Sequence, residues 1–248
     1  MTKMTKMTEI KEGVCLLAVE ASGNSASMAV VTGDAVLGVA KREATHAHAP
    51  HMADLLRQCL AEAEVEAGAI THVAAGCGPG SFTGIRTGLA LAKGVALALA
   101  VPIYGVSSLT ALLSEISEVP SESTSMSILV VVDSRRGGYF ACLYDGGHKA
   151  VTPVFETNAE TLAGRVKEIS PQTVTLLGHD AANLARALQS EGITITKTIA
   201  TDPNALAVAY YVRHLIQNGV AAADYPAIAH YHRGASLGGK ASGKQQAN

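Results

Sequence analysis

The stretch Gly76–Arg86, GCGPGSFTGIR, carries the most information about the fold. It lies between a short apolar segment and a long run rich in alanine and leucine, so it predicts a turn from a strand into a helix. Its glycines permit close backbone approach, and Pro79 stiffens the turn. Ser81 and Thr83 are suited to cap the helix, whose N-terminal N–H groups could hold an anion. No Gly-Lys-Ser/Thr follows, which excludes a Walker A loop and leaves a structural joint and an anion-binding loop as alternatives.

The helix that follows this turn carries a row of small residues at every fourth position: Gly84, Gly88, Ala92, Ala96 and Ala100. Residues at this spacing share one face of a helix. Small side chains on that face let another backbone approach closely. The row therefore favours packing either on a sheet of the same lobe or on a second helix, including one from another subunit.

The rest of the first half alternates strands and helices. We expect strands at Val14–Glu20, Ser27–Thr32, Ala35–Lys41, Ile70–Gly76 and Val101–Val106, and helices at Pro50–Val65, Gly84–Ala100 and Ser107–Ile116. A tight hairpin turn, Gly33-Asp34, joins the second and third strands. The stretch Ser117–Ser127, rich in Ser, Glu and Pro, marks a boundary.

A similar order restarts after this boundary. Expected strands are Ile128–Asp133, Tyr139–Tyr144, Lys149–Phe155, Val174–Leu177 and Ile193–Thr198, and expected helices are Ala159–Ile169, Ala181–Glu191 and Asn204–Asn218. We expect the last helix to be capped from Asp202, with Pro203 at its first position. The repeated order predicts an α/β fold of two actin/hexokinase-like (ASKHA) lobes, each a mixed sheet with flanking helices. The expected division is a flexible tail at 1–13, lobes at 14–117 and 128–235, a linker at 118–127 and a disordered tail at 236–248.

The composition excludes several classes of protein. The chain has 248 residues and a formal net charge of −2, with 48% hydrophobic and 16% charged residues, which excludes extensive disorder. The near-zero charge argues against a dedicated nucleic-acid binder, and the scarcity of aromatic residues argues against stacking platforms for single strands. The longest apolar run, Leu89–Ile103, is too short to span a bilayer. Cys15, Cys59, Cys77 and Cys142 are widely spaced and read as small buried residues in a reducing cytoplasm, and Met1–Gly13 lacks the apolar core of a signal peptide.

Several blocks resemble the bacterial TsaB family of tRNA threonylcarbamoyladenosine biosynthesis proteins. The most specific is GPGSFTGIRTGLALAKGVALA followed by VPIYGVSSL; within it the family-motif loop comprises Gly78, Pro79, Gly80, Ser81, Phe82, Thr83, Gly84 and Arg86. Weaker matches are the opening strand and turn at Leu16–Ser22, His48 ahead of its helix, the closing segment Ala229–Arg233, and a second-lobe motif with Asp133, Arg135 and Gly137. The resemblance covers about Val14 to Arg233.

This resemblance implies an actin-like ATPase fold without catalysis of its own. It implies no catalytic residue, no metal and no cofactor of its own, with ATP bound only within an assembled complex. The implied partners are the related catalytic subunit TsaD and the ATPase TsaE, which transfer a threonylcarbamoyl group to the adenosine beside the anticodon; tRNA is reached only through the complex. Alone, the chain would pair with itself. Glu20 departs from the family, which usually has Asp there, and this makes independent use of ATP more doubtful.

The two first-lobe helices are the expected docking face for the partner. The candidate interface residues are Met52, Leu55, Leu56, Cys59, Ile85, Gly88, Leu89, Ala92, Lys93 and Ala96. Two such faces could pack as a helix bundle that buries about 1,600 Å² in total. On this interpretation Gly88→Leu would block the complex and leave the monomer folded.

Other functions depend on other residues. An ATP-dependent phosphotransferase or ATPase of the same fold would need phosphate turns at Ala21–Ser25 and Ser134–Gly138. A metallopeptidase would need a pair of metal ligands. The candidates are His46, His48 and His51, but Pro50 breaks the helix between His48 and His51, so these two need not share a face. Asp133 with Arg135 and Arg136 could clamp an anion, although such a trio more often caps a hairpin. Cys77 is expected at a buried strand end rather than as a reactive thiol.

Overall fold

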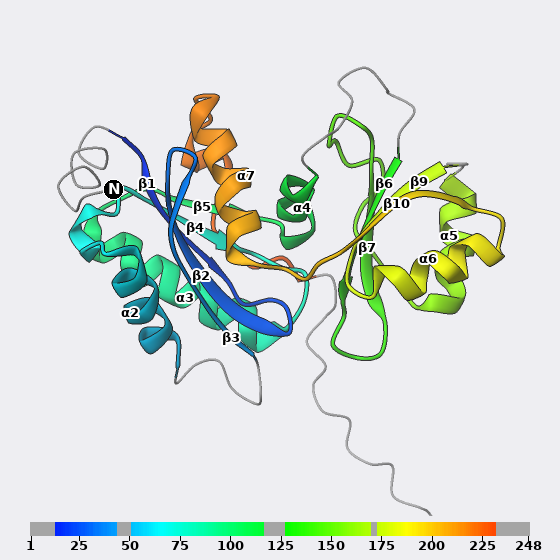
Figure 1. Ribbon diagram of the computed structural model, residues 1–248, viewed down its shortest axis with the longest axis horizontal. Coiled ribbons are helices and arrows are strands. Elements are labelled where there is room, and N and C mark those ends of the chain that lie inside the picture. The colour runs from blue at the N-terminus through cyan, green and yellow to red at the C-terminus, as the bar shows by residue number, and fades with distance from the viewer. Residues whose placement is uncertain (1–12, 44–50, 117–126, 170–172, 232–248) are drawn as a thin grey trace, which may run out of the picture.

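The computed structural model describes residues 13–43, 51–116, 127–169 and 173–231, and these form two lobes, each built on one five-stranded sheet (Figure 1). The expected tails, most of the linker, His46, His48 and Arg233 lie outside the described residues. The fold class is confirmed: both sheets are mixed and carry flanking helices.

The first sheet has the order β3-β2-β1-β4-β5. Its strands are β1 (Cys15–Glu20), β2 (Ser25–Thr32), β3 (Ala35–Glu43), β4 (His72–Gly76) and β5 (Ile103–Val106). The first three form an antiparallel meander, and β4 and β5 run parallel to β1. Helices α2 (Met52–Ala63) and α3 (Phe82–Leu99) cover one face, with a 3-10 turn at Ala67–Ala69 between α2 and β4.

The second sheet has the order β10-β9-β6-β7-β8. Its strands are β6 (Ser127–Asp133), β7 (Tyr139–Tyr144), β8 (Phe155–Thr157), β9 (Thr173–Gly178) and β10 (Thr194–Ala200). Helices α5 (Ala159–Ile169) and α6 (Ala181–Ser190) cover its outer face. The chain repeats the meander and the parallel crossovers of the first lobe, as the restarted sequence pattern predicts.

A central core joins the two lobes. Strand side chains alternate between faces: in β1, Leu16 and Ala18 point into this core, whereas Leu17 and Val19 point toward α2 and α3. Strand β6 contributes Ile128, Val130 and Val132 to the same core. Two helices pack in this core between the sheets, α4 (Ser108–Leu112) and α7 (Ala205–Gln217), as Figure 1 shows. The 3-10 turn Leu113–Glu115, which follows α4, packs there too.

The prediction that the second lobe extends from residue 128 to residue 235 is wrong at its C-terminal end. Helix α7, the 3-10 turn Ala222–Asp224 and the segment that follows pack on the first lobe. The Ala205 N–H donates to Ser27 Oγ (2.9 Å), the Gly105 N–H donates to the Tyr225 carbonyl (2.7 Å), and the His230 N–H donates to the Cys77 carbonyl (2.8 Å). The apolar side of α7 covers the face of the first sheet that α2 and α3 leave open.

Two local predictions are also corrected. The strand expected at Lys149–Phe155 is reduced to one isolated bridge at Ala150, with β8 beginning at Phe155. The Asp145 carboxylate accepts the Lys149 N–H (2.9 Å) in a tight turn, and Pro153 has no N–H for a ladder. Helix α7 is capped by Asn204 rather than Asp202, because Asn204 Oδ1 accepts the Ala207 N–H (2.9 Å), and Pro203 precedes this cap.

Candidate functional site

A buried carboxyl group stands at the end of β1. Glu20 is only 1% exposed, and Oε1 accepts the Ser22 N–H (2.7 Å) while Oε2 accepts the Ser108 hydroxyl (2.7 Å). Ser22 Oγ in turn donates to Ser108 Oγ (2.9 Å). Burial raises the pKa of Glu20, and the hydrogen bonds from Ser22 and Ser108 oppose that rise. Gly76, at the end of β4, makes room for the carboxyl group, since a Cβ there would overlap Glu20 Oε2.

The glycine loop closes over the turn that follows β1. The Ser81 N–H donates to the Ser22 carbonyl (2.7 Å), and the Gly78 carbonyl accepts the Ser108 N–H (2.8 Å). A Cβ at Gly84 would overlap the Ala21 carbonyl oxygen. Ser81 Oγ accepts the Gly84 N–H (3.2 Å), so the predicted cap of α3 is confirmed. The loop therefore acts as a structural joint, and the Ser22 N–H, the kind of donor that a phosphate-binding turn offers to a nucleotide, is already bonded to Glu20 Oε1.

Two of the motif blocks, far apart in sequence, meet at the start of α3. The Arg86 guanidinium lies 3.8 Å from the centre of the Phe82 ring, and Arg86 Nε donates to the Tyr231 hydroxyl (2.9 Å). The two rings lie 5.0 Å apart and are 43% and 44% exposed. We call Phe82, Arg86 and Tyr231 the aromatic–arginine cluster. Sequence reasoning missed it, although the two blocks quoted for the resemblance contain all three residues.

The predicted docking residues mostly face inward. Helix α2 buries Met52, Leu55 and Cys59, and α3 buries Ile85, Gly88, Leu89, Ala92 and Ala96, in the core that the two helices share with the first sheet. A Cβ at Gly88 would lie 3.4 Å from Ala21 Cβ, so the small-residue row packs on the sheet of its own lobe. These residues are therefore not an exposed docking face. Of the candidates, only Leu56 is half-buried and Lys93 exposed.

A different surface of the same helices points outward. From Ala90 onward the exposed residues of α3 are Ala90, Lys93, Gly94, Leu97 and Ala98, and the half-buried apolar residues of the two helices include Leu56 and Leu60 of α2 and Leu91 and Val95 of α3. We call this set the outer face of α2 and α3. Leu97 is 84% exposed, and a Cβ at Gly94 would meet no atom of the described residues within 4 Å.

The second-lobe motif caps its own hairpin. Asp133 Oδ1 accepts the Arg135 N–H (2.7 Å), and Asp133 Oδ2 lies 3.5 Å from Arg135 Nη1. Arg135 has a φ of 64° and Gly137 a φ of 78°, both in the left-handed region of a tight turn. The interpretation as a hairpin cap is confirmed for Asp133 and Arg135. Arg136 is exposed beside them.

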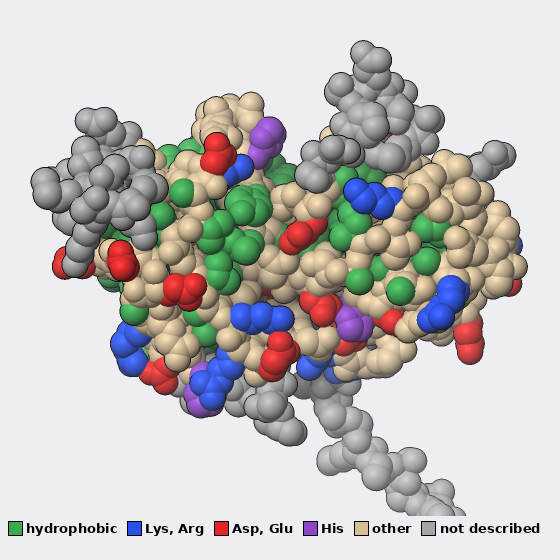
Figure 2. All heavy atoms as spheres, viewed as in Figure 1, with side chains coloured by type: hydrophobic (Ala, Val, Ile, Leu, Met, Phe, Trp, Pro, Cys, Tyr) green, Lys and Arg blue, Asp and Glu red, His purple; other side chains and the backbone are tan. Residues whose placement is uncertain are grey.

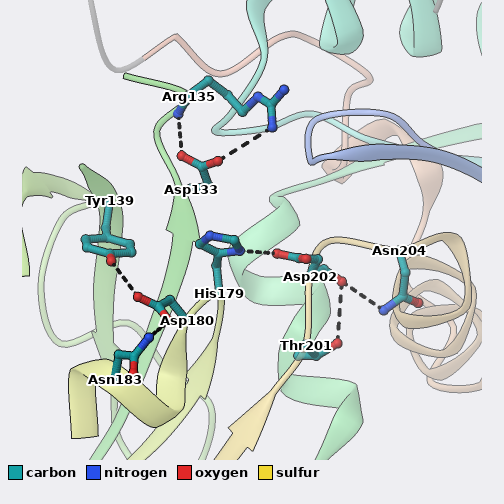
Figure 3. A network of polar contacts seen from close by, with 9 residues as sticks. All are labelled: Asp133, Arg135, Tyr139, His179, Asp180, Asn183, Thr201, Asp202 and Asn204. Atoms are coloured by element: carbon teal, nitrogen blue, oxygen red, sulfur yellow. Dashed lines mark hydrogen bonds and ion pairs between the residues drawn. The ribbon is translucent and has the colours of Figure 1, made fainter. Parts of the chain in front are cut away.

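Figure 3 shows further polar contacts next to this motif. His179 Nδ1 lies 2.7 Å from Asp202 Oδ1, and the Tyr139 hydroxyl donates to Asp180 Oδ2 (3.1 Å). Burial and the Asp180 carboxylate raise the pKa of Tyr139. His179 and Asp180 follow β9 and Asp202 follows β10, so they share with Asp133 the carboxyl ends of parallel strands, where α/β sheets bind ligands. Tyr139 begins the antiparallel strand β7 opposite Asp133. The sequence signal that could have found them is the pair His179-Asp180 directly after an expected strand.

Among the described residues, neither a cluster of metal ligands nor an accessible thiol is present. Within the described residues, no group of three His, Cys, Asp or Glu side chains is arranged to hold a metal ion. All four cysteines are free and buried in the structure, as expected. Cys77 is fully buried directly after β4, which confirms the expected buried strand end, and burial raises the pKa of its thiol to about 12.

Comparison with known proteins places this two-lobed chain in a family. The family model for TsaD, tRNA N6-adenosine threonylcarbamoyltransferase, matches residues 27–234. The chain therefore belongs to the TsaD family. Its named relatives include TsaB proteins and a tRNA N6-adenosine threonylcarbamoyltransferase of Chelativorans sp.. The resemblance to TsaB is confirmed by a protein of Escherichia coli, 31% identical over 43% of this chain and 47% of its own length, and by one of Bacillus subtilis, 25% identical over 67% and 72%.

Two further matches concern the length of the relatives and the fold. An uncharacterized protein of Mycobacterium tuberculosis is 34% identical over 52% of this chain and 57% of its own length. The chain thus spans about half the length of the first curated relatives that it matches. The solved structure of YeaZ from Pseudomonas aeruginosa superposes with a TM-score of 0.64 at 21% identity, over 88% of this chain and 99% of that one, and supports the fold.

Proposed function

We propose that this chain acts in the biosynthesis of tRNA threonylcarbamoyladenosine as a TsaB-type subunit without catalysis of its own. In this proposal it docks on a TsaD-type catalytic subunit, works alongside the ATPase TsaE, and pairs with itself when alone. The named relatives in Escherichia coli and Bacillus subtilis are tRNA threonylcarbamoyladenosine biosynthesis proteins, which supports the process. The family model supports kinship with the catalytic subunit.

The uncovered side of α3 is the observation that carries the docking proposal. Among the described helices, α3 alone has the length and composition of a helix that could cross a membrane. Only 33% of its residues are buried within the chain. Its buried residues face the sheet, which leaves small and apolar residues of the outer face in solvent. Exposed apolar patches of this kind mark interaction sites. A helix without acidic residues and with a small side chain at Gly94 suits close packing against helices of a related subunit.

The interior of the first lobe supports the absence of independent ATP turnover. The actin-like fold implies a nucleotide whose phosphates contact the turn after β1. In this chain the Ser22 N–H is bonded to Glu20, and the Ser22 carbonyl is bonded to the Ser81 N–H. A buried carboxyl group and a closed loop thus occupy the turn, so its residues do not fit a triphosphate. We propose that any ATP belongs to the assembled complex.

Size-exclusion chromatography with light scattering tests the docking. The wild-type chain, mixed with the TsaD-type protein of the same cell, should elute as a 1:1 complex. Gly94→Leu should abolish this complex and any self-dimer, because the new side chain extends into the space that a partner would fill. Its own fold should be unaffected, since the position is open in the free chain.

The matched control is Gly164→Leu in α5, which also places a leucine on an exposed helical glycine with open space around it, but in the second lobe. This variant should bind as the wild type does. A Gly94→Leu chain that still forms the 1:1 complex would remove the outer face of α2 and α3 from the interface. Gly88→Leu is unsuitable, because Gly88 packs against Ala21 and Val19 inside the lobe.

A further inference from the structure

The aromatic–arginine cluster lies on the same side of α3 as the outer face of α2 and α3. Residues three or four positions apart share one side of a helix. In α3 five exposed residues follow this spacing: Phe82, Arg86, Ala90, Lys93 and Leu97. At 1.5 Å per residue, this row is about 22 Å long. A partner helix that packs along the row over Ala90 and Leu97 therefore also covers Arg86.

The Arg86 guanidinium is held in place by two contacts. Its central carbon lies 3.8 Å from the centre of the Phe82 ring, and its Nε donates to the Tyr231 hydroxyl (2.9 Å). Nη1 and Nη2 remain as donors. Within the described residues, no carboxylate forms an ion pair with this guanidinium. The side chain is therefore a cation of fixed position that still lacks a counter-charge.

The charges of α3 have one sign. On the face shown in Figure 2, basic and acidic side chains are interspersed over the described residues. Helix α3 instead contains Arg86 and Lys93 and no Asp or Glu. Docking along the row would take Arg86 out of water, and a buried charge without a counter-charge is strongly unfavourable. Lys93 has a flexible stem that can carry its ammonium group to the edge of an interface, whereas Arg86 is held by its two contacts. The counter-charge of Arg86 must then come from the partner.

We infer that Arg86 binds a carboxylate, from an Asp or a Glu, on the helix of the TsaD-type subunit that packs along α3. The planar fork of Nη1 and Nη2 matches the two oxygens of a carboxylate. Phe82 and Tyr231 flank this fork and exclude water from the pair, as residues around an interface hot spot do. Tyr231 is a positioning residue, because it acts through Nε of Arg86. The inference rests on the proposed docking and adds to it the chemistry of the partner's contact group.

Biolayer interferometry with the immobilised TsaD-type protein of the same cell tests this inference. Arg86→Gln should raise the dissociation rate constant about 30-fold or more, because loss of one member of a buried charge pair costs about 2 kcal/mol or more. Arg86→Lys keeps the charge without the planar fork and should also dissociate faster. Tyr231→Phe removes only the hydroxyl that holds Nε and should weaken binding about 5-fold, the value of one hydrogen bond.

Two control variants separate this pair from general effects of charge. Lys93→Gln removes one cation from the same row, and it should change mainly the association rate constant and its salt dependence, as expected for a charge at the edge of an interface. Arg165 is an exposed arginine whose guanidinium lies 5.1 Å from the centre of the Phe155 ring, in the second lobe. Arg165→Gln should bind as the wild type does. Thermal unfolding of each free chain, followed by circular dichroism, checks that the variants are folded.

An Arg86→Gln chain that dissociates at the wild-type rate would overturn the inference. A change confined to the association rate and its salt dependence would overturn it too, because Arg86 would then lie in water at the edge of the interface. In both cases, a wild-type complex that Gly94→Leu abolishes leaves the docking proposal standing. If the wild type does not bind the TsaD-type protein, the docking proposal fails and this inference fails with it.

Discussion

Glu20 keeps its carboxyl group out of solvent and is held by donors from Ser22 and Ser108. Burial disfavours the charged form and raises the pKa of this group above the usual value for Glu, about 4.3. A group whose pKa is higher in the folded state stabilises the fold while it is protonated. This stabilisation is fully present at a pH below the usual pKa of Glu. It is lost as the pH rises through the pKa that Glu20 has in the folded protein.

Glu20→Gln should remove this loss, because the amide is neutral at every pH and has nearly the same shape. The free energy of unfolding of the variant minus that of the wild type should increase as the pH increases from 5 to 8. Urea unfolding of both chains measures this difference. Glu191→Gln serves as the control. The hydrogen bond from Lys167 lowers the pKa of Glu191, so the stabilisation that this carboxylate gives the wild type is lost as the pH falls. The stability difference for this variant should therefore change with pH in the opposite direction. Equal pH dependence of wild type and Glu20→Gln would contradict the buried-carboxyl account.

Helix α3 has two sides with opposite requirements. Toward the sheet, Gly84 and Gly88 lie against Ala21 and Val19, where the glycine loop closes on the first turn. Away from the sheet, Gly94 and Leu97 lie in solvent. The glycines of α3 that face the sheet thus hold the turn after β1 in place. The opposite side of the same helix belongs to the proposed docking surface.

Alanine substitutions on the two sides of α3 should have opposite signs. Gly84→Ala should lower the free energy of unfolding by about 2 kcal/mol or more, because the added Cβ overlaps the backbone at Ala21. Gly94→Ala should raise it by up to about 1 kcal/mol, the helix-propensity gain at an open position. Denaturant unfolding of the free chains measures both. If Gly84→Ala proved as stable as the wild type, the close packing of the glycine loop on the first turn would be wrong.

The elements that the sequence predicted well are those with a local signal. The period of apolar residues located most strands, and Ser81 identified the cap of α3. Predictions failed where tertiary packing decides the outcome. The row Gly84–Gly88–Ala92–Ala96 suits a sheet or a second helix equally, so only the fold shows that it faces inward. Likewise, nothing local to α7 says that it returns to the first sheet.

The candidate site was accessible from the sequence only in pieces. The motif loop and the closing segment were both recognised, but their meeting at Arg86 and Tyr231 depends on a chain path of 145 residues between them. The pair His179 and Asp202 depends on β9 and β10 lying side by side. Glu20 was recognised as unusual, whereas its burial against Gly76 and Ser108 follows only because the ends of β1 and β4 meet the start of α4.

At the scale of the molecule, the two sheets share a core through α4 and α7, and the outer face of α2 and α3 lies on the far side of the first sheet from that core. The arrangement leaves this face free for a partner while the lobes remain tied together. The closed first turn, bound by Glu20 and the glycine loop, supports the proposed role as a subunit without turnover of its own.

Mass-spectrometric measurement of threonylcarbamoyladenosine in tRNA from cells that lack this chain tests the central claim most directly. The account predicts that the modified nucleoside falls when the chain is absent, returns with the wild type and with Gly164→Leu, and fails to return with Gly94→Leu. An unchanged level of the nucleoside in the absence of the chain would contradict a role in this modification.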